Sequence, residues 1–376
     1  MRDRVLVTGG AGFIGSFLVD ELVKKGKRVR VLDNFEAQVH QGRIPSYLNP
    51  HAELVRADVR DRGAVKKALT GVTHVVHLAA RVGVGQANYQ IRDYMDVNVG
   101  GMATLLDIIV NEKTDIEKIV MTASMTSYGE GMYSCRSHGK YKMHIRPEEQ
   151  LKKRQWNFFC PKCRKKLDPV PTDEDTIFEN KGIYALSKQT QEEMLFSIGS
   201  LYNIPAVSLR LFNVYGPRQS LSNPYTGVSA IFISRLRNNV SPVVFEDGLQ
   251  SRDFVSVHDV IGAILLSMKK TSANFIPINI GSGIPTGIAD LAKTLSRLLG
   301  MKIPPMVINE GRKGDIRHCF ADISRAKKLL GWEPKISFHD GLKELVEWSL
   351  YQKPTDLFEK AVSELSSKKL LIKHDH

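Results

Sequence analysis

Cysteine is scarce in this chain, and its scarcity excludes a disulfide-held fold. Only 4 of the 376 residues are cysteines, whereas small secreted disulfide folds are far richer in them. No apolar run approaches the roughly 18 residues of a membrane-spanning helix, so we expect no membrane partner. The first apolar strand begins near Arg4, which leaves no room for a signal peptide. These absences predict a cytoplasmic protein.

Acidic residues are in the minority. The chain has 53 Lys and Arg against 40 Asp and Glu, a formal net charge of +13, which suits nucleic acid or anionic small molecules. The basic residues are dispersed, except for a cluster between Arg136 and Lys166, and no stripe of them alternates with aromatics. We therefore expect a small anionic ligand and no nucleic acid.

Glycines gather near the N-terminus, where a strand turns into a helix. Residues 5–7 predict a buried strand, residues 13–25 predict a helix, and TGGAGFIG at 8–15 lies at their junction. Such a turn needs unusual backbone angles and lets a pyrophosphate approach bare backbone at a helix N-terminus. A second strand, 28–32, ends in Asp33, an acid placed to hold the adenosine ribose. The pattern predicts a dinucleotide site; an ordinary tight turn is the alternative.

Strands and helices alternate through the first 130 residues. The spacing predicts strands at 53–56, 73–80 and 118–122, and this rhythm is typical of an α/β fold with a Rossmann-type doubly wound parallel sheet. The rhythm breaks at 131–171 and resumes with a helix at 183–201. We expect a dinucleotide-binding domain over 1–212, carrying an insertion at 131–171, then a smaller α/β substrate lobe over 213–352 and a flexible tail over 353–376.

Tyr184 and Lys188 lie one helical turn apart in YALSK. A neighbouring ammonium lowers the pKa of a phenol, which makes tyrosine a usable base near neutrality. Ser124 lies upstream, at the end of a central strand, where its hydroxyl can bond a substrate oxygen and share a proton with the tyrosine. Without Ser124 and its strand upstream, the Tyr-x3-Lys spacing alone would indicate a solvated helix face.

Together these motifs resemble those of the extended short-chain dehydrogenase/reductases, the NAD-dependent nucleotide-sugar epimerases and dehydratases. The resemblance runs from about Val5 to Trp348, interrupted by 131–171. It rests on TGGAGFIG, Asp33, Asp58, HLAA at 77–80, SMTSYG at 124–129, YALSK at 184–188 and RLFNVYGP at 210–217. It implies NAD as cofactor, a nucleotide-diphosphate sugar as substrate and a homodimer.

The resemblance also implies roles for individual residues. The implied catalytic residues are Ser124, Tyr184 and Lys188. The implied cofactor-binding residues are Gly9, Gly12, Phe13, Ile14, Gly15, Asp33, Asn34, Asp58, Val59, Leu78, Ala79, Ala80, Asn98, Thr122, Tyr184 and Lys188. The implied substrate-binding residues are Arg81, Ser124, Thr126, Asn213, Arg252, Arg312 and Asp315. Arg252 and Arg312 would hold the diphosphate, which suits guanidinium geometry.

Two features of this chain narrow the choice of reaction and cofactor within the family. The family's 4,6-dehydratases carry an Asp-Glu pair directly after the catalytic Ser/Thr, where this chain has Met125 and Thr126. Asp33, with no arginine just after it, repels a 2′-phosphate and favours NAD over NADP. The implied reaction is 4-epimerisation, in which a sugar hydroxyl is oxidised to a ketone and re-reduced on the other face.

The choice of sugar rests on shorter segments. Residues 81–86, 221–227, 245–254 and 314–326 and the insertion are similar to dTDP-L-rhamnose 4-epimerase-type sequences. UDP-glucose or UDP-uronate 4-epimerisation, a keto-sugar oxidoreductase of the same fold, and a non-catalytic dinucleotide-sensing or nucleic-acid-binding scaffold are the alternatives.

Three of the four cysteines lie in the insertion. Cys135-x2-His138 and Cys160-x2-Cys163 form two knuckles separated by 21 residues, which predicts a zinc-ribbon-like insertion with a structural Zn²⁺ and all four positions filled by protein. His144 is the reserve ligand, and a reduced loop without an ion is the alternative. We expect the insertion to lack an apolar core of its own.

Overall fold

A seven-stranded parallel sheet lies at the centre of the computed structural model, which describes residues 4–179 and 181–372. Its strands run in the order β13-β9-β5-β4-β1-β2-β3. Their bounds are β1 (Arg4–Thr8), β2 (Arg28–Asp33), β3 (Glu53–Arg56), β4 (His74–His77), β5 (Lys118–Ser124), β9 (Ala206–Leu211) and β13 (Ile276–Ile280). The strand order reverses between β1 and β4, and ligands of such sheets bind at that reversal. The predicted α/β, Rossmann-type fold is confirmed.

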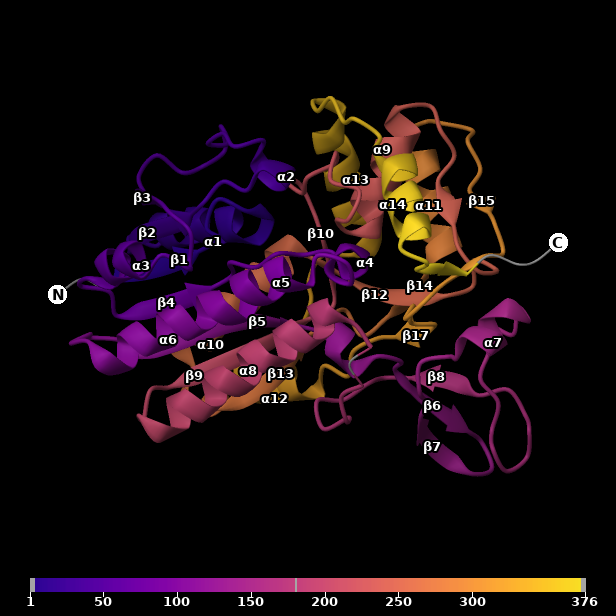
Figure 1. Ribbon diagram of the computed structural model, residues 1–376, viewed down its shortest axis with the longest axis horizontal. Helices are drawn as coiled ribbons and strands as arrows, with labels where there is room; N and C mark the ends of the chain where they lie inside the picture. Colours follow the sequence, from indigo (N-terminus) through magenta and orange to yellow (C-terminus); the bar gives the residue numbers. More distant parts are fainter. Residues whose placement is uncertain (1–3, 180, 373–376) are drawn as a thin grey trace.

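Helices cover both faces of the sheet, as the apolar runs of its strands require (Figure 1). Val5 and Val7 of β1 pack in one cluster with α1 (Phe13–Lys24), α10 (Val257–Lys269) and α12 (Ser324–Leu330). Leu6, between them, points to the other face. There it packs with α3 (Arg62–Leu69), α6 (Gly101–Asn111) and α8 (Ile183–Leu201). One strand therefore supports both helix layers, because successive side chains point to opposite faces.

A smaller lobe packs beside the carboxyl ends of these strands. Its core cluster joins three helices to a short sheet. The helices are α9 (Val228–Arg237), α11 (Ile288–Leu298) and α13 (Phe338–Leu350). The sheet strands are β10 (Asn213–Tyr215), β12 (Ser251–Ser256), β14 (Pro285–Gly287) and β17 (His318–Cys319), and a separate pair is β11 (Val243–Val244) with β15 (Met306–Val307). The predicted boundary at residue 212 does not separate the lobes cleanly, because β13, α10 and α12 return to the first sheet.

The insertion forms a small sheet of its own, at the lower right of Figure 1. Its strands are β6 (Met132–Cys135), β7 (Gly139–Lys142) and β8 (Asp168–Val170), paired antiparallel in the order β7-β6-β8, and a short helix α7 (Glu148–Lys152) follows β7. Tyr133, Phe158 and Leu167 are buried together with Cys135 and Cys160. The expectation that this segment lacks an apolar core is therefore wrong, since its apolar residues are dispersed in sequence and meet only on folding.

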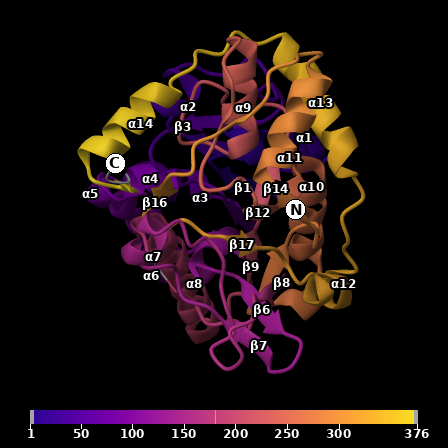
Figure 2. The same cartoon turned by 90° about the vertical axis from the view of Figure 1, so that its right-hand side faces the viewer.

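The C-terminal segment is not the flexible tail that we expected. Residues 358–367 form helix α14 (Phe358–Ser367), which buries Ala361 and Leu365. β18 (Leu371–Ile372) then pairs antiparallel with β16 (Gly311–Arg312). The abundance of lysine hides this amphipathic spacing. Both views show α14 beside α4 (Val84–Ala87), at the junction of the lobes (Figures 1 and 2). The remainder of the expected tail, 373–376, lies outside the described residues.

Several short elements complete the chain. They are α2 (Ala37–His40), α5 (Ile91–Tyr94), the π-helical segment η1 (Met95–Gly100), and the 3-10 turns η2 (Met125–Tyr128) and η3 (Thr271–Ala273). α5, η1 and α6 follow one another without a break from Ile91 to Asn111. None of the helices described in the structure combines the length and the apolar character that crossing a membrane demands.

Candidate functional site

A cavity of about 450 Å³ lies between the two lobes, at the carboxyl ends of β1, β2, β4 and β5. Residues from both lobes line it, including Gly9, Asp33 and Ser124 from the first and Asn213 and Tyr225 from the second. Its size is that of a typical small-molecule site. Of the predicted cofactor-binding residues, all but Asp58 and Asn98 line this cavity.

The glycine-rich turn forms the floor of the cavity. Gly9 has φ +67°, and a Cβ there would lie 2.8 Å from the backbone nitrogen of Ala79. A Cβ on Gly15 would lie 2.2 Å from the carbonyl oxygen of Gly9. Helix α1 begins at this turn with Gly12 as its N-cap and no side-chain cap. The turn therefore presents bare backbone at a helix N-terminus, which fits the pyrophosphate of a dinucleotide.

Acidic and amide side chains border the next strand end. Asp33 is buried, and its two carboxylate oxygens accept hydrogen bonds from the backbone N–H groups of Ala11 (3.0 Å) and Phe35 (2.9 Å). Asn34 donates to Asp58 at 3.0 Å. The hydrogen bond from Arg60 lowers the pKa of Asp58. Asp33 thus lines the cavity itself. Asp58 does not line it, but it accepts a hydrogen bond from Asn34, which does.

The three predicted catalytic residues all line the cavity. Ser124 ends β5, and Tyr184 and Lys188 occupy the first turns of α8. Burial raises the pKa of Tyr184 to about 12, and a hydrogen bond with Ser124 partly opposes that rise. Burial lowers the pKa of Lys188 to about 7, against the charge of Glu192, which raises it. The expected lowering of the tyrosine pKa is therefore wrong for the protein alone, because desolvation by burial is the largest effect on this phenol.

Two further predicted residues support this trio without lining the cavity. The hydroxyl of Thr126 donates to Oγ of Ser124 at 2.9 Å. Asn98 lies in η1, where its oxygen accepts from the backbone of Arg81 (2.8 Å) and its amide donates to Ser187 (2.9 Å). π-helical turns of this kind are common at functional sites. The amide of Asn98 therefore joins the loop after β4 to α8.

The predicted substrate residues divide into two groups. Arg81 and Asn213 line the cavity, but Arg252, Arg312 and Asp315 do not. Arg312 donates to Asp315 at 2.8 Å, and Arg252 donates to the backbone oxygens of Ser251 and Arg317. The ligand roles of these three residues stay predictions.

Several polar contacts in and beside the cavity were not predicted from the sequence. Gln38 donates to Gln86 (3.1 Å) and to Asn223 (2.9 Å), and so joins the two lobes. The hydroxyls of Tyr89 and Tyr225 donate to Glu364 of α14, at 2.7 and 2.6 Å. The partners are up to 275 positions apart in sequence, so no local signal indicates them.

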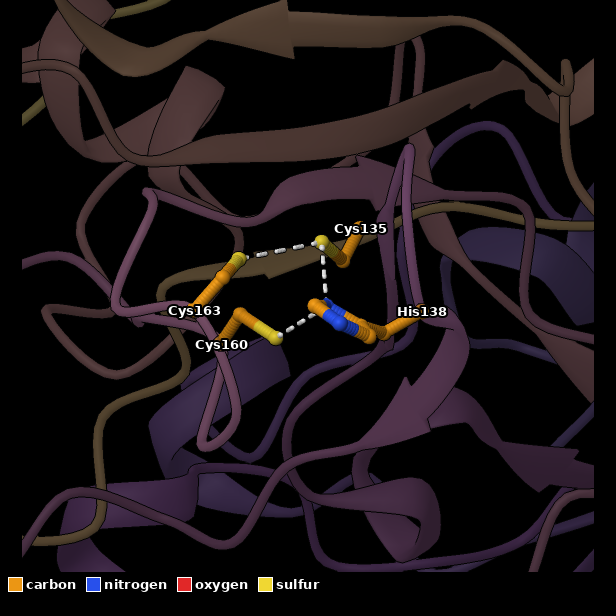
Figure 3. A group of neighbouring side chains, drawn as sticks. All are labelled: Cys135, His138, Cys160 and Cys163. Atoms are coloured by element: carbon orange, nitrogen blue, oxygen red, sulfur yellow. Dashed lines mark hydrogen bonds between the residues drawn. The ribbon is translucent and has the colours of Figure 1, made fainter.

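The four predicted metal ligands converge in the insertion (Figure 3). Their ligand atoms all lie within 4.8 Å of one another. Nδ1 of His138 lies 3.5 Å from Sγ of Cys135 and 3.4 Å from Sγ of Cys160, and Sγ of Cys135 lies 3.6 Å from Sγ of Cys163. A tetrahedral zinc with ordinary bond lengths would separate its ligand atoms by about 3.5 to 3.8 Å. The donor set and its spacing therefore fit zinc.

The other candidates in the insertion region have different partners. The reserve ligand, His144, lies 3.3 Å from a carboxylate oxygen of Glu179, away from the cluster. Cys319, the fourth cysteine, is buried and contacts the hydroxyl of Thr172. Neither residue therefore belongs to the cluster of four knuckle residues.

Several known proteins are similar to this chain in sequence and in fold. The model of the NAD dependent epimerase/dehydratase family matches residues 5–281. A dTDP-L-rhamnose 4-epimerase of Burkholderia thailandensis is 36% identical over 352 residues, which cover 92% of this chain and 94% of that protein. The Thermotoga maritima UDP-glucose 4-epimerase, solved with UDP-glucose, superposes with a TM-score of 0.74 at 30% identity and covers 92% of this chain and 98% of its own. The Bacillus cereus UDP-glucuronic acid 4-epimerase, solved with UDP-glucuronic acid and NAD, has a TM-score of 0.75 at 26% identity and covers 93% and 100%.

Proposed function

The chain belongs to the NAD dependent epimerase/dehydratase family, and we propose that it is an NAD-dependent nucleotide-sugar 4-epimerase. One observation carries the proposal: Ser124, Tyr184 and Lys188 line the same cavity as the glycine-rich turn. A proton-transfer group thus lies in the cavity that fits a dinucleotide. A sensor would need the turn but not the trio.

The cofactor half of the cavity suits NAD. The bare turn at Gly9 and Gly15 would hold the pyrophosphate, and Asp33 would accept hydrogen bonds from the ribose hydroxyls. The Asp33 carboxylate would repel the extra phosphate of NADP. When bound, the nicotinamide supplies a hydride acceptor that later returns the hydride.

The protein groups then handle the proton. In the oxidising half, the phenolate oxygen of Tyr184 would take the proton of the sugar hydroxyl and become a phenol, and Ser124 would donate a hydrogen bond to that same sugar oxygen. In the reducing half, Tyr184 returns the proton after the keto sugar has presented its other face. Burial raises the pKa of Tyr184 to about 12, so the phenolate needs positive charge nearby. Lys188, one helical turn away, would supply it in its protonated form.

We propose a dTDP-L-rhamnose-type sugar as the substrate, with UDP-glucose and UDP-glucuronate as the second candidates. The first is supported by the 36% identical relative and the others by the two solved structures. Arg81 and Asn213 line the cavity and would contact the sugar diphosphate. Arg252, Arg312 and Asp315 do not line the cavity, and their contact with the diphosphate stays a prediction.

We also propose a homodimer that pairs through α6 and α8. Two exposed apolar residues of α8 support this face: Leu186 is 40% exposed and Leu201, the last residue of the helix, is 74% exposed. Light scattering of the purified protein distinguishes a dimer from a monomer.

The four knuckle residues are proposed to hold one structural Zn²⁺. Protein atoms fill all four positions, so the ion has no open position for substrate. Its part is to fix the hairpin of β6 and β7 against the 160–163 turn.

A panel of dTDP- and UDP-sugars tests the enzymatic proposal. We expect one pair of C4 epimers to interconvert, seen by NMR, while absorbance at 340 nm stays nearly flat because no net redox change occurs. Tyr184→Phe should retain NAD and lose about 10²- to 10⁴-fold in rate. Steady NADH accumulation would instead indicate a net oxidoreductase, and unchanged turnover in Tyr184→Phe would contradict the assigned base.

A further inference from the structure

Lys142 reaches from the insertion to the turn that carries the catalytic serine. Its ammonium donates to the carbonyl oxygen of Tyr128 at 2.7 Å and also to that of Glu130. These two carbonyls flank Gly129, which has φ +67°. The 3-10 turn η2 leads from Ser124 to this point. One lysine therefore fixes both sides of the exit from the catalytic turn.

The same turn is fixed to the second lobe through Glu130. The carboxylate of Glu130 is fully buried and accepts from the hydroxyl of Tyr133 (2.9 Å) and the backbone N–H of Arg317 (2.7 Å). Arg146, also from the insertion and buried, donates to Glu246 (2.8 Å) and to the carbonyl of Asp315 (3.1 Å). The insertion thus contacts the catalytic turn on one side and the 315–317 loop on the other.

These contacts originate next to the metal site. Lys142 pairs with Met132 across the β6–β7 hairpin, and the far end of that hairpin pairs Cys135 with Gly139. Ligands Cys135 and His138 lie at that far end, so a bound ion fixes the hairpin register. The register of a strand pair decides which of its side chains face a neighbouring turn. An ion bound at the far end of the hairpin would therefore help to keep the side chain of Lys142 directed at the turn after Ser124.

We infer that the insertion is a positioning element for the catalytic turn and that Lys142 is the positioning residue through which it acts. Burial lowers the pKa of Lys142, as expected for an ammonium that gives up water for backbone carbonyls. Its removal would leave those carbonyls without their donor and free the segment after Ser124. The inference rests on the proposed function only where turnover is measured.

The test compares Lys142→Met with Lys140→Met, which changes an exposed lysine of the same strand. Hydrogen exchange of residues 125–131 is followed in the full-length protein, together with zinc content, bound NAD and steady-state kinetics. We expect Lys142→Met to keep zinc and NAD, to exchange on the order of tenfold faster over 125–131, and to lose kcat with KM little changed. Lys142→Arg, which keeps a cationic donor, should recover part of kcat, which a general loss of stability would not allow. Lys140→Met should match the wild type.

A second arm uses the unmutated protein. Removal of zinc by a chelator should speed exchange over 125–131 while the amides of α3, on the other side of the sheet domain, keep their protection. Wild-type exchange over 125–131 in Lys142→Met, or equal changes in the Lys140→Met control, would overturn the inference. If no sugar of the panel is converted, the proposed function is contradicted. The hydrogen-exchange result over 125–131 would still decide the role of Lys142, because it does not depend on turnover.

Discussion

The carboxylate of Asp33 accepts a hydrogen bond from the backbone N–H of Ala11, 22 positions earlier, at 3.0 Å. This bond joins the end of β2 to the glycine-rich turn after β1. Its second oxygen accepts from Phe35 at 2.9 Å. One buried acid therefore shapes the turn for the pyrophosphate and lies where the ribose is expected.

Asp33→Asn tests this double role. The amide keeps only one acceptor oxygen, so one of the two backbone N–H groups loses its partner, at about 1–3 kcal/mol. We expect a lower melting temperature and NAD binding weakened by about tenfold or more. Calorimetric titration with NAD measures the second effect. Asp107→Asn, at an exposed position of α6, serves as the control; NAD affinity unchanged in Asp33→Asn would exclude the ribose role.

The buried Lys188 predicts a distinctive pH dependence of stability in the NAD-free protein. Burial lowers its pKa from 10.5 to about 7, so between these values the unfolded chain binds one proton more than the folded chain. The stability of the wild type then rises with pH over this window. Below pH 7 the lysine is charged in the folded protein, and its burial lowers the free energy of unfolding of the wild type by the full desolvation cost. Lys188→Met lacks this charge, so below pH 7 it should melt on the order of 5 °C higher than the wild type.

The comparison is made at pH 6.5, 8.5 and 10. The advantage of Lys188→Met should shrink as pH approaches 10.5, where both states of the wild type are neutral. A constant difference between the two proteins across this range would show that the lysine is charged in the folded state throughout.

Loss of the metal should unfold the insertion before the sheet domain. Structural zinc sites contribute directly to folding free energy, although the Tyr133 cluster gives this segment some core of its own. We expect about one zinc per chain by atomic emission and its loss in Cys160→Ser, together with early proteolysis within 131–171. Ser137→Ala, exposed in the same hairpin, should keep the ion. Purified wild-type protein without metal would exclude the zinc proposal.

Glu364 is expected to support the sugar end of the cavity. Hydrogen bonds from Tyr225 and Tyr89 lower its pKa, and Tyr225 lines the cavity. Glu364→Ala removes the shared acceptor, so KM for the nucleotide sugar should rise by roughly 3- to 10-fold, the cost of about one hydrogen bond, with kcat nearly kept. Lys360→Ala, exposed on the same helix, is the matched control. Equal KM values in the two variants would argue against this support.

Local signals explain what the sequence could predict. The glycine turn, Asp33 and the Tyr184–Lys188 pair lie within or beside single elements, so short spacings indicated them. The two knuckles also rest on short spacings, and their convergence in the structure agrees with them. The packing of α14, the core of the insertion and the Gln38–Asn223 bond depend on segments far apart in the chain, which no short window contains. The tyrosine pKa was predicted in the wrong direction because sequence shows the neighbouring charge but not the burial.

The position of Glu364 has a consequence for biosynthesis. The glycine turn, helix α8 and both tyrosines that bond to Glu364 are all translated before it. The sheet can gather its first five strands while the ribosome is still working, since domains fold from the N-terminal side as they emerge. The contact of Tyr225 with Glu364 therefore forms late in synthesis. A nascent chain can form the dinucleotide-binding turn before the side of the cavity next to Tyr225 is complete.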